Sequence, residues 1–322
     1  MVPLTEHRTP KGESGSVLIL SLWILALLAL LSGSLAYRTR LECQLTQYQW
    51  DEIRLIQLAK MAVFDAADIW RHQTGLYAAF SQTWNDNSER FKDHPLPGGF
   101  YTASHENCYG LEDEASKLNV NNASAAVLNR LFEGHKEVVP EILAWRSGSG
   151  LGSDTSGETG QQVVTARHGP LKSVEELLLV PRMTPEIYWD VAADLTVYTD
   201  GGVNVNTASE RVLLALGLSS SLVNKILEFR RGRDNRTGTE DDGVFKAVES
   251  VLPDLRTQMR VTDTESQLLT ALLQKRLLTV QSGVVRINFV TRLPGRPIAR
   301  RFTVVAAAQA VPPQILFWRE VY

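Results

Sequence analysis

The stretch GSVLILSLWILALLALLSGSLAY, from Gly15 to Tyr37, decides how this chain folds. It holds no ionisable side chain except the terminal tyrosine. Residues 16–36 would form a helix about 31 Å long, enough to cross the apolar core of a bilayer. The rest of the 322-residue chain is too long and too polar to be membrane-embedded. The sequence therefore predicts one membrane span followed by a large domain on one side of the membrane.

Three interpretations of this segment differ in how it is processed. Small residues at Ser34 and Ala36 fit the cleavage site of a secretory signal, whereas an uncleaved anchor would keep the whole segment. The third is a type IV pilin-like signal, in which a short polar leader ends in glycine and is removed while the apolar segment stays. A leader at 1–15, ending in Gly15 before Ser16, fits that boundary.

The residues beyond the span favour the pilin-like interpretation. From Arg38 to about His72 there is neither proline nor glycine, and apolar side chains recur every three or four positions. These positions are Leu41, Leu45, Tyr48, Leu55, Ala59, Ala62, Ala66 and Ile69. Together with the span they predict one helix of about 57 residues and about 85 Å. A pilin needs such continuity because one helix both anchors and polymerises the subunit, so the apolar stripe would face either the protein's own sheet or neighbouring subunits.

Composition narrows the functional classes. The chain carries 33 basic and 36 acidic residues, so no charge excess indicates a polyanionic partner. It has no nucleophile elbow, no phosphate-binding loop and no defensible His–carboxylate spacing, so we expect no enzymatic activity. Cys43 and Cys108 lie beyond the span and form either a disulfide, if that side is oxidising, or two buried thiols.

The soluble part contains an internal duplication. LNVNNASAAVLNRL at 118–131 aligns with VNVNTASERVLLAL at 203–216, at an offset of 85 residues. EILAWR at 141–146 aligns with KILEFR at 225–230, KSVEEL at 172–177 with KAVESV at 246–251, and LTV at 195–197 with LTV at 278–280. The conserved order of these segments indicates a repeated unit of short helices. Candidate helix starts are Asn122 or Ser124, Thr207 or Ser209, Ser173 with Glu176 as a capping box, and Thr184 before Pro185.

After Leu277 the pattern changes to strands separated by Gly and Pro turns, and Gly99–Glu112 is an earlier strand candidate. The predicted fold class is α+β, with a pilin-like long N-terminal helix, an antiparallel sheet, and an inserted all-α domain of two helix-hairpin-helix-like (SAM-like) repeats. The expected segments are the leader at 1–15, the transmembrane helix at 16–36, the remaining helix and first strands at 37–115, the inserted domain at 116–276, and the C-terminal strands of the sheet at 277–322.

The repeated unit N-V-N-x-A-S…I-L-x-[WF]-R…K-[SA]-V-E resembles the helix-hairpin-helix modules of competence-type DNA receptors. Over essentially its full length, the chain resembles the minor pseudopilin K family of bacterial type II secretion systems. The residues that carry this resemblance are Gly15 and Ser16 with the apolar helix, EDEASKLNVNNAS, LTVYTDGGVNVNTAS, GTEDDGVF and the terminal strands. Major pilins and pseudopilins have Glu at the fifth mature position, where this chain, like the K family, lacks it and has Leu20.

The resemblance to the K family implies a structural role. Prepilin peptidase would cut after Gly15 and methylate Ser16. The single-pass inner-membrane protein, with its bulk in the periplasm, would join the minor pseudopilins I and J. Together they would initiate or cap a pseudopilus of major pseudopilin, at whose tip the chain would lie, for export of folded proteins across the outer membrane.

The alternative function is a membrane-anchored DNA-binding receptor of the competence type. A helix-hairpin-helix binds phosphate through a G-x-G hairpin supported by basic side chains. Neither hairpin here has two spaced glycines, and residues 203–252 hold seven basic and seven acidic residues. We therefore expect no nucleic-acid partner.

The segment 234–243, DNRTGTEDDG, is the one acidic cluster with the chemistry of a metal site. Calcium prefers carboxylate and carbonyl oxygens on a flexible, glycine-containing loop. Asp234, Glu240, Asp241 and Asp242 could supply such oxygens, although the EF-hand spacing is absent. The resemblance to the K family, whose members are associated with calcium in the helical domain, implies Ca²⁺ as a cofactor; the alternative is a solvated acidic loop.

Overall fold

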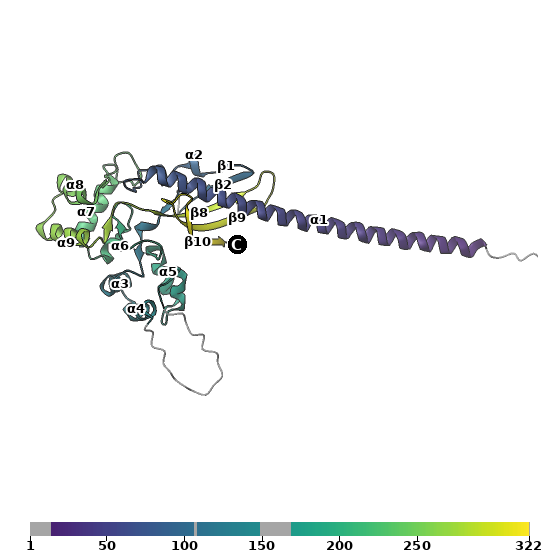
Figure 1. Cartoon of the computed structure of the whole chain (residues 1–322), viewed down its shortest axis with the longest axis horizontal. Helices are drawn as coiled ribbons and strands as arrows, with labels where there is room; N and C mark the ends of the chain where they lie inside the picture. The colour runs from purple at the N-terminus through teal and green to yellow at the C-terminus, as the bar shows by residue number, and fades with distance from the viewer. Residues whose placement is uncertain (1–13, 106–107, 149–168, 322) are drawn as a thin grey trace, which may run out of the picture. The chain divides into compact units, whose positions relative to one another are not determined.

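The structure is a computed structural model that describes residues 14–105, 108–148 and 169–321. The chain divides into two compact units, Met1–Arg54 and Leu55–Tyr322. The helix α1, Ser14–Gln73, contributes residues to both units (Figure 1). Its uninterrupted course confirms the long helix expected from the absence of proline and glycine after the apolar segment.

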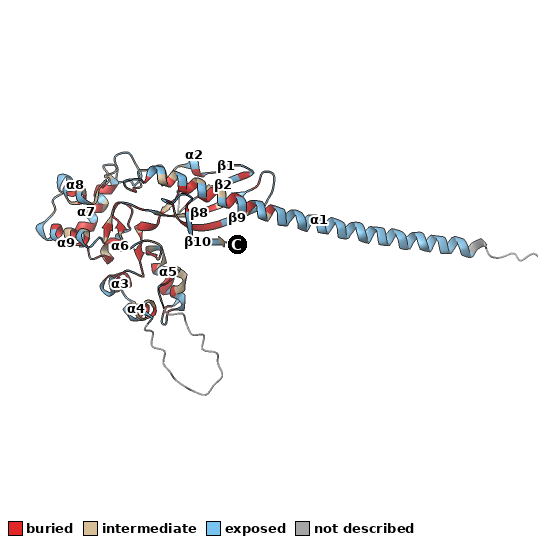
Figure 2. Ribbon diagram, viewed as in Figure 1, coloured by how far each residue is buried: buried red, intermediate tan, exposed pale blue. Residues whose placement is uncertain are grey.

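The described residues of the first unit form the N-terminal part of α1. Residues 16–50 are exposed throughout, as the pale-blue ribbon in Figure 2 shows. Among the described residues, α1 is the one helix that is long and apolar enough to cross a membrane, judged by length and composition. The predicted span thus lies within an exposed apolar helix, which is the surface that lipid requires.

The second unit contains a six-stranded antiparallel sheet with the order β1-β2-β8-β9-β10, in which β3 also pairs with β8. Its strands are β1 His94–Leu96, β2 Gly99–Ala103, β3 Glu112–Asp113, β8 Val284–Arg292, β9 Ala299–Ala307 and β10 Gln314–Val321. The last three confirm the expected terminal strands. The single strand expected at 99–112 was wrong, because β2 ends at Ala103 and His105 then pairs with Cys108 before β3 begins.

The distal part of α1 packs on one face of this sheet. Ala59, Ala62 and Ala66 are fully buried and belong to one cluster with Ile287 and Phe289 of β8. The apolar stripe of α1 therefore divides. Its residues from Leu55 to Ala66 face the protein's own core, whereas Leu41, Leu45 and Tyr48 are 46%, 54% and 62% exposed. The short helix α2, Ser88–Phe91, and the β1–β2 hairpin complete this part of the unit.

The helical domain is inserted between β3 and β8, after the short helix η1, Glu114–Ser116. The first repeat comprises β4 Leu118–Asn119, α3 Ala125–Leu131, η2 Lys136–Val138, α4 Val139–Ser147, η3 Val174–Leu179, α5 Pro185–Val191, η4 Ala192–Asp194 and β5 Leu195–Thr196. The second comprises β6 Val203–Asn204, α6 Glu210–Ala215, α7 Ser220–Arg231, η5 Val248–Ser250, α8 Val251–Gln258, α9 Asp263–Gln274 and β7 Leu278–Thr279. The two repeats share one apolar core, and Figure 1 shows α3–α5 grouped apart from α7–α9.

Each repeat closes on itself through a two-residue parallel strand pair. Leu118 pairs with Leu195 in the first repeat, and Val203 pairs with Leu278 in the second. The expectation that all of 277–322 belongs to the main sheet was therefore wrong at its start. Leu278 occupies the position in the second repeat that Leu195 occupies in the first, so its strand partner lies within the helical domain.

The helix starts were partly predicted. The hydroxyls of Ser124 and Ser209, rather than their alternatives, accept backbone N–H groups at the N-caps of α3 and α6, and Thr184 caps α5. The capping box expected at Ser173 was wrong: its side chain makes no capping bond, and the Glu176 carboxylate instead accepts the N–H of Lys172.

Candidate functional site

Two adjacent carboxylates connect the sheet to the inserted domain. Asp113, the last residue of β3, is buried and accepts hydrogen bonds from Asn204 Nδ2 at 2.7 Å and Thr207 Oγ1 at 2.6 Å. Its other carboxylate oxygen accepts the N–H of Ala115 at 2.8 Å. Burial raises the pKa of Asp113. This carboxylate therefore ties the start of the second repeat to the edge of the sheet.

The neighbouring carboxylate ties the first repeat to the sheet. Glu114 is fully buried, and its carboxylate accepts hydrogen bonds from Nε and Nη2 of Arg286 at 2.9 and 2.8 Å. Thr196 of β5 donates to it at 2.7 Å, and the ammonium of Lys117 lies 3.5 Å away. Burial alone would raise the pKa of Glu114, but Lys117 and Arg286 hold it at about 2. The carboxylate is thus ionised, and it joins three segments distant in sequence.

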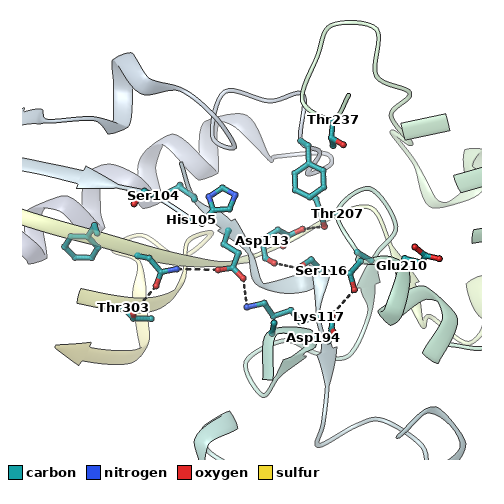
Figure 3. A pocket seen from close by; sticks show the side chains of 18 of the residues that line it. Ser104, His105, Asp113, Ser116, Lys117, Asp194, Thr207, Glu210, Thr237 and Thr303 are labelled. Carbon is teal, nitrogen blue, oxygen red and sulfur yellow. Dashed lines mark hydrogen bonds and ion pairs between the residues drawn. The ribbon is translucent and has the colours of Figure 1, made fainter. Parts of the chain in front are cut away.

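A cavity of about 830 Å³ lies beside this junction (Figure 3). Its walls come from the face of β8 and β9 opposite α1, from η1, and from both repeats. Lining residues include Phe80, His105, Asp113, Lys117, Asp194, Thr207, Glu210, Leu227, Arg230, Thr237, Asn288, Val290, Thr303 and Val321. The side chains labelled in Figure 3 are all polar, Asp113 and Lys117 among them. Its volume falls in the range of small-ligand sites.

Arg230, near the end of α7, is like Lys117 a buried cation that lines this cavity. It is 7% exposed, and its Nη1 donates to the carbonyls of Ala208 at 2.7 Å and Val205 at 3.5 Å. The ring of Phe80 lies 5.4 Å from its guanidinium carbon. Burial, with the nearby charge of Arg231, lowers the pKa of Arg230 to about 10. The side chain still carries its charge at neutral pH.

The two repeats hold their loops with equivalent side chains. Asn121 in the first repeat both donates to the carbonyl of Leu171 and accepts its N–H, and Asn206 does the same with Phe245 in the second. Arg146 donates to the carbonyl of Val120 in the first repeat, as Arg230 donates to that of Val205 in the second. The duplicated N-V-N and I-L-x-[WF]-R segments therefore encode loop anchors, a role that the alignment of the two copies did not reveal.

The fold and its insertion match a solved complex. A chain of the GspK-GspI-GspJ complex of the Type 2 Secretion System of enterotoxigenic Escherichia coli aligns with a TM-score of 0.61. The alignment covers 86% of this chain and 99% of that chain, at 15% sequence identity. The chain has a GspK-like fold. No protein-family model and no curated protein matches its sequence.

In this GspK-like fold the predicted processing residues lie at the start of α1. The helix begins at Ser14, so Gly15 and Ser16 fall in its first turn. Leu20, the expected fifth mature residue, is 61% exposed. Cleavage and methylation at this boundary stay predictions.

The predicted calcium residues lie on the loop between α7 and η5. The structure brings Asp241 and Asp242 together, since the hydroxyl of Thr239 donates to both at 2.9 and 3.1 Å. Asp234 instead accepts the N–H of Arg236, and Glu240 is exposed. Over residues 14–105, 108–148 and 169–321, no three His, Cys, Asp or Glu side chains converge as a metal site. The fit to Ca²⁺ is thus limited to two carboxylates, and calcium binding stays a prediction.

The two cysteines lie in different units. Cys43 is exposed on α1, Cys108 is half-buried after β2, and no disulfide joins them. The expectation of two buried thiols does not describe Cys43, whose helix face is open.

Sequence analysis missed the junction residues. Asp113 and Glu114 belong to the EDEAS segment that carries the family resemblance, but nothing local marks them as buried. Arg286, the partner of Glu114, is 172 residues away along the chain, so this pairing exists only after the sheet closes.

Proposed function

We propose that this protein is a structural minor pseudopilin of a type II secretion system. The observation that carries the proposal is the GspK-like fold, which includes the two-repeat helical insertion between β3 and β8. The matched chain belongs to a complex with GspI and GspJ. We propose equivalent minor pseudopilins I and J as partners of this chain.

In the proposed role, α1 anchors the subunit in the inner membrane and contacts neighbouring pseudopilins. The exposure of Leu41, Leu45 and Tyr48 supports this contact, because exposed apolar side chains in a row mark an interaction surface. The absence of the fifth-position Glu, replaced by Leu20, suits a subunit at the tip with no neighbour above it. The rest of the chain would lie in the periplasm, and the complex would initiate or cap the pseudopilus.

The first test is the N-terminal mass of the membrane-purified protein, produced with and without prepilin peptidase. A peptidase-dependent start at methylated Ser16 is expected, and Gly15→Lys should abolish it. A start at Tyr37 or at Met1 in the presence of the peptidase would contradict the proposal.

The second test is co-purification of the full chain with minor pseudopilins I and J. Leu45→Glu places a charge in the exposed stripe and should reduce recovery of both partners. The matched control is Gln47→Glu, because positions two apart on a helix point to opposite sides. Equal recovery with both variants would remove the stripe as the contact surface.

We also propose that the loop at 234–243 takes a calcium ion through Asp241 and Asp242 with backbone carbonyls. Hard oxygen ligands on a glycine-containing loop support this. Addition of Ca²⁺ to chelator-treated protein should raise the unfolding temperature. The double variant Asp241→Asn, Asp242→Asn should lose that rise, and an identical rise in the variant would place any calcium elsewhere.

A further inference from the structure

Arg230 has hydrogen-bonding capacity that the described chain does not use. A guanidinium carries five N–H donors in a fixed plane. Nη1 donates to two backbone carbonyls, but within the described residues neither Nε nor Nη2 makes a hydrogen bond, and Nε is buried. A buried donor without an acceptor is costly, so its retention calls for a partner.

Arg230 also lacks a counter-charge. None of the ion pairs formed by described residues includes it, although the charge of Asp242, on the loop between α7 and η5, acts on it from beyond ion-pair distance. Removing an uncompensated charge from water is unfavourable. Negative charge from outside the chain would relieve this cost.

The first repeat shows that the backbone contact alone does not require such burial. Arg146 makes the same contact from Nη1, at 2.7 Å to Val120, but its side chain is only half-buried. Water can therefore satisfy the remaining donors of Arg146. Arg230 is only 7% exposed, so its side chain has less access to water.

The cavity provides room for more than an ion. Its volume is about 830 Å³, and half-buried apolar side chains of Phe80, Leu227, Val290 and Val321 line it together with Arg230. Thr237 lines the large cavity and also a second, water-sized cavity next to Arg230. A ligand here would meet these apolar side chains together with charged ones, among them Asp113, Lys117, Glu210 and Arg301 besides Arg230.

We propose that this cavity binds a carboxylate carried on an apolar body, with Arg230 holding the carboxylate. Nε and Nη2 lie on one edge of the guanidinium and present two parallel donors, which match the two oxygens of a carboxylate. The carboxylate can come from a small organic acid or from an acidic side chain flanked by apolar residues in a peptide.

The test uses the full-length protein in a non-ionic detergent and isothermal titration. The probes are 4-phenylbutyrate and its uncharged amide, and the peptides acetyl-Leu-Glu-Leu-amide and acetyl-Leu-Gln-Leu-amide. We expect saturable binding of at least one acid and, because a charged hydrogen bond is lost, affinity at least about tenfold weaker for its amide. Preference for 4-phenylbutyrate would indicate a small acid as the source, and preference for the glutamate peptide a protein segment.

Three variants distinguish a loss of ligand binding from a loss of folding. Arg230→Lys keeps a charge but loses the paired donors and should weaken binding at least about tenfold, whereas the matched Arg146→Lys should leave it unchanged. Thr237→Glu leaves Arg230 intact and places a competing carboxylate in the cavity, so it should abolish binding in a folded protein even where Arg230→Lys does not fold. The proposal is overturned by equal binding of acid and amide, by unchanged binding in Thr237→Glu, or by no saturable binding up to about 10 mM.

Discussion

Arg286 of β8 donates two hydrogen bonds to Glu114, one to each carboxylate oxygen, at 2.9 and 2.8 Å. The pair lies where the sheet meets the inserted helical domain, and Thr196 of the first repeat completes it. Because Asp113, one residue earlier, binds Asn204 and Thr207, two consecutive residues hold both repeats. The start of the inserted domain is thus held to the sheet by ion pairs and hydrogen bonds as well as by apolar packing.

Glu114→Gln should destabilise the second unit strongly. The change leaves Arg286 without the buried carboxylate that pairs with it, whereas Lys117 keeps its pair with Glu112 at 2.6 Å, and breaking a buried ion pair costs about 3–5 kcal/mol. The free energy of unfolding of the full chain in non-ionic detergent, from denaturant titration, measures it. The control is Asp190→Asn, which breaks an exposed pair with Arg211 and should cost about 1 kcal/mol or less. Equal effects would show that the junction pair adds no more than a surface contact.

The same carboxylate should make stability depend on pH. The pKa of Glu114 is depressed from 4.5 to about 2, so its contribution is complete above pH 4.5 and is lost as pH falls toward 2. Asp113 acts in the opposite sense: its raised pKa gives stabilisation below 3.8 that is lost as pH rises through the folded-state value. The difference in unfolding free energy between wild type and Glu114→Gln should therefore shrink between pH 4.5 and 2. A constant difference across that range would contradict the assignment.

Asn206→Ala should release the loop of the second repeat. The side chain of Asn206 is 3% exposed and satisfies both backbone groups of Phe245 at 2.9 and 3.0 Å, so its removal leaves buried polar groups and costs about 1–3 kcal/mol each. The matched variant Asn121→Ala should cost less, because Asn121 is only half-buried. Hydrogen exchange at the amides of Phe245 and Leu171 measures each loop directly. The prediction is wrong if Asn121→Ala accelerates exchange at Leu171 more than Asn206→Ala accelerates exchange at Phe245.

Gly110→Ala should be poorly tolerated. A Cβ at this position would overlap the backbone carbonyls of Asn85 and Trp84, which cannot move aside as a flexible side chain can. Gly283→Ala is the control, since its Cβ would meet the side chain of Gln309 at an ordinary 3.6 Å. Thermal unfolding should show a large decrease for Gly110→Ala and little change for Gly283→Ala. Similar unfolding temperatures would mean that the segment before β3 can shift.

Local sequence determined those features that depend on neighbouring residues alone. The length of α1 follows from the absence of proline and glycine after the apolar segment, and the strands after residue 283 follow from β-branched runs. Short polar side chains before apolar patterns narrowed the caps of α3 and α6 to two candidates each, and the structure decides for Ser124 and Ser209. The duplication was also visible, because both copies keep the same segments in the same order. The GspK-like fold confirms the fold class inferred from them.

Tertiary structure alone decided which partners these residues meet. The strand Leu278–Thr279 joins β6 instead of the main sheet because the second repeat closes on itself as the first does. Glu114 becomes a buried anion only once Arg286 arrives from a strand 172 residues away. Arg146 and Arg230 occupy equivalent positions, yet Arg146 is half-buried whereas Arg230 is buried and lines a cavity. Burial and electrostatic environment arise from contacts between distant segments, and no local pattern encodes them.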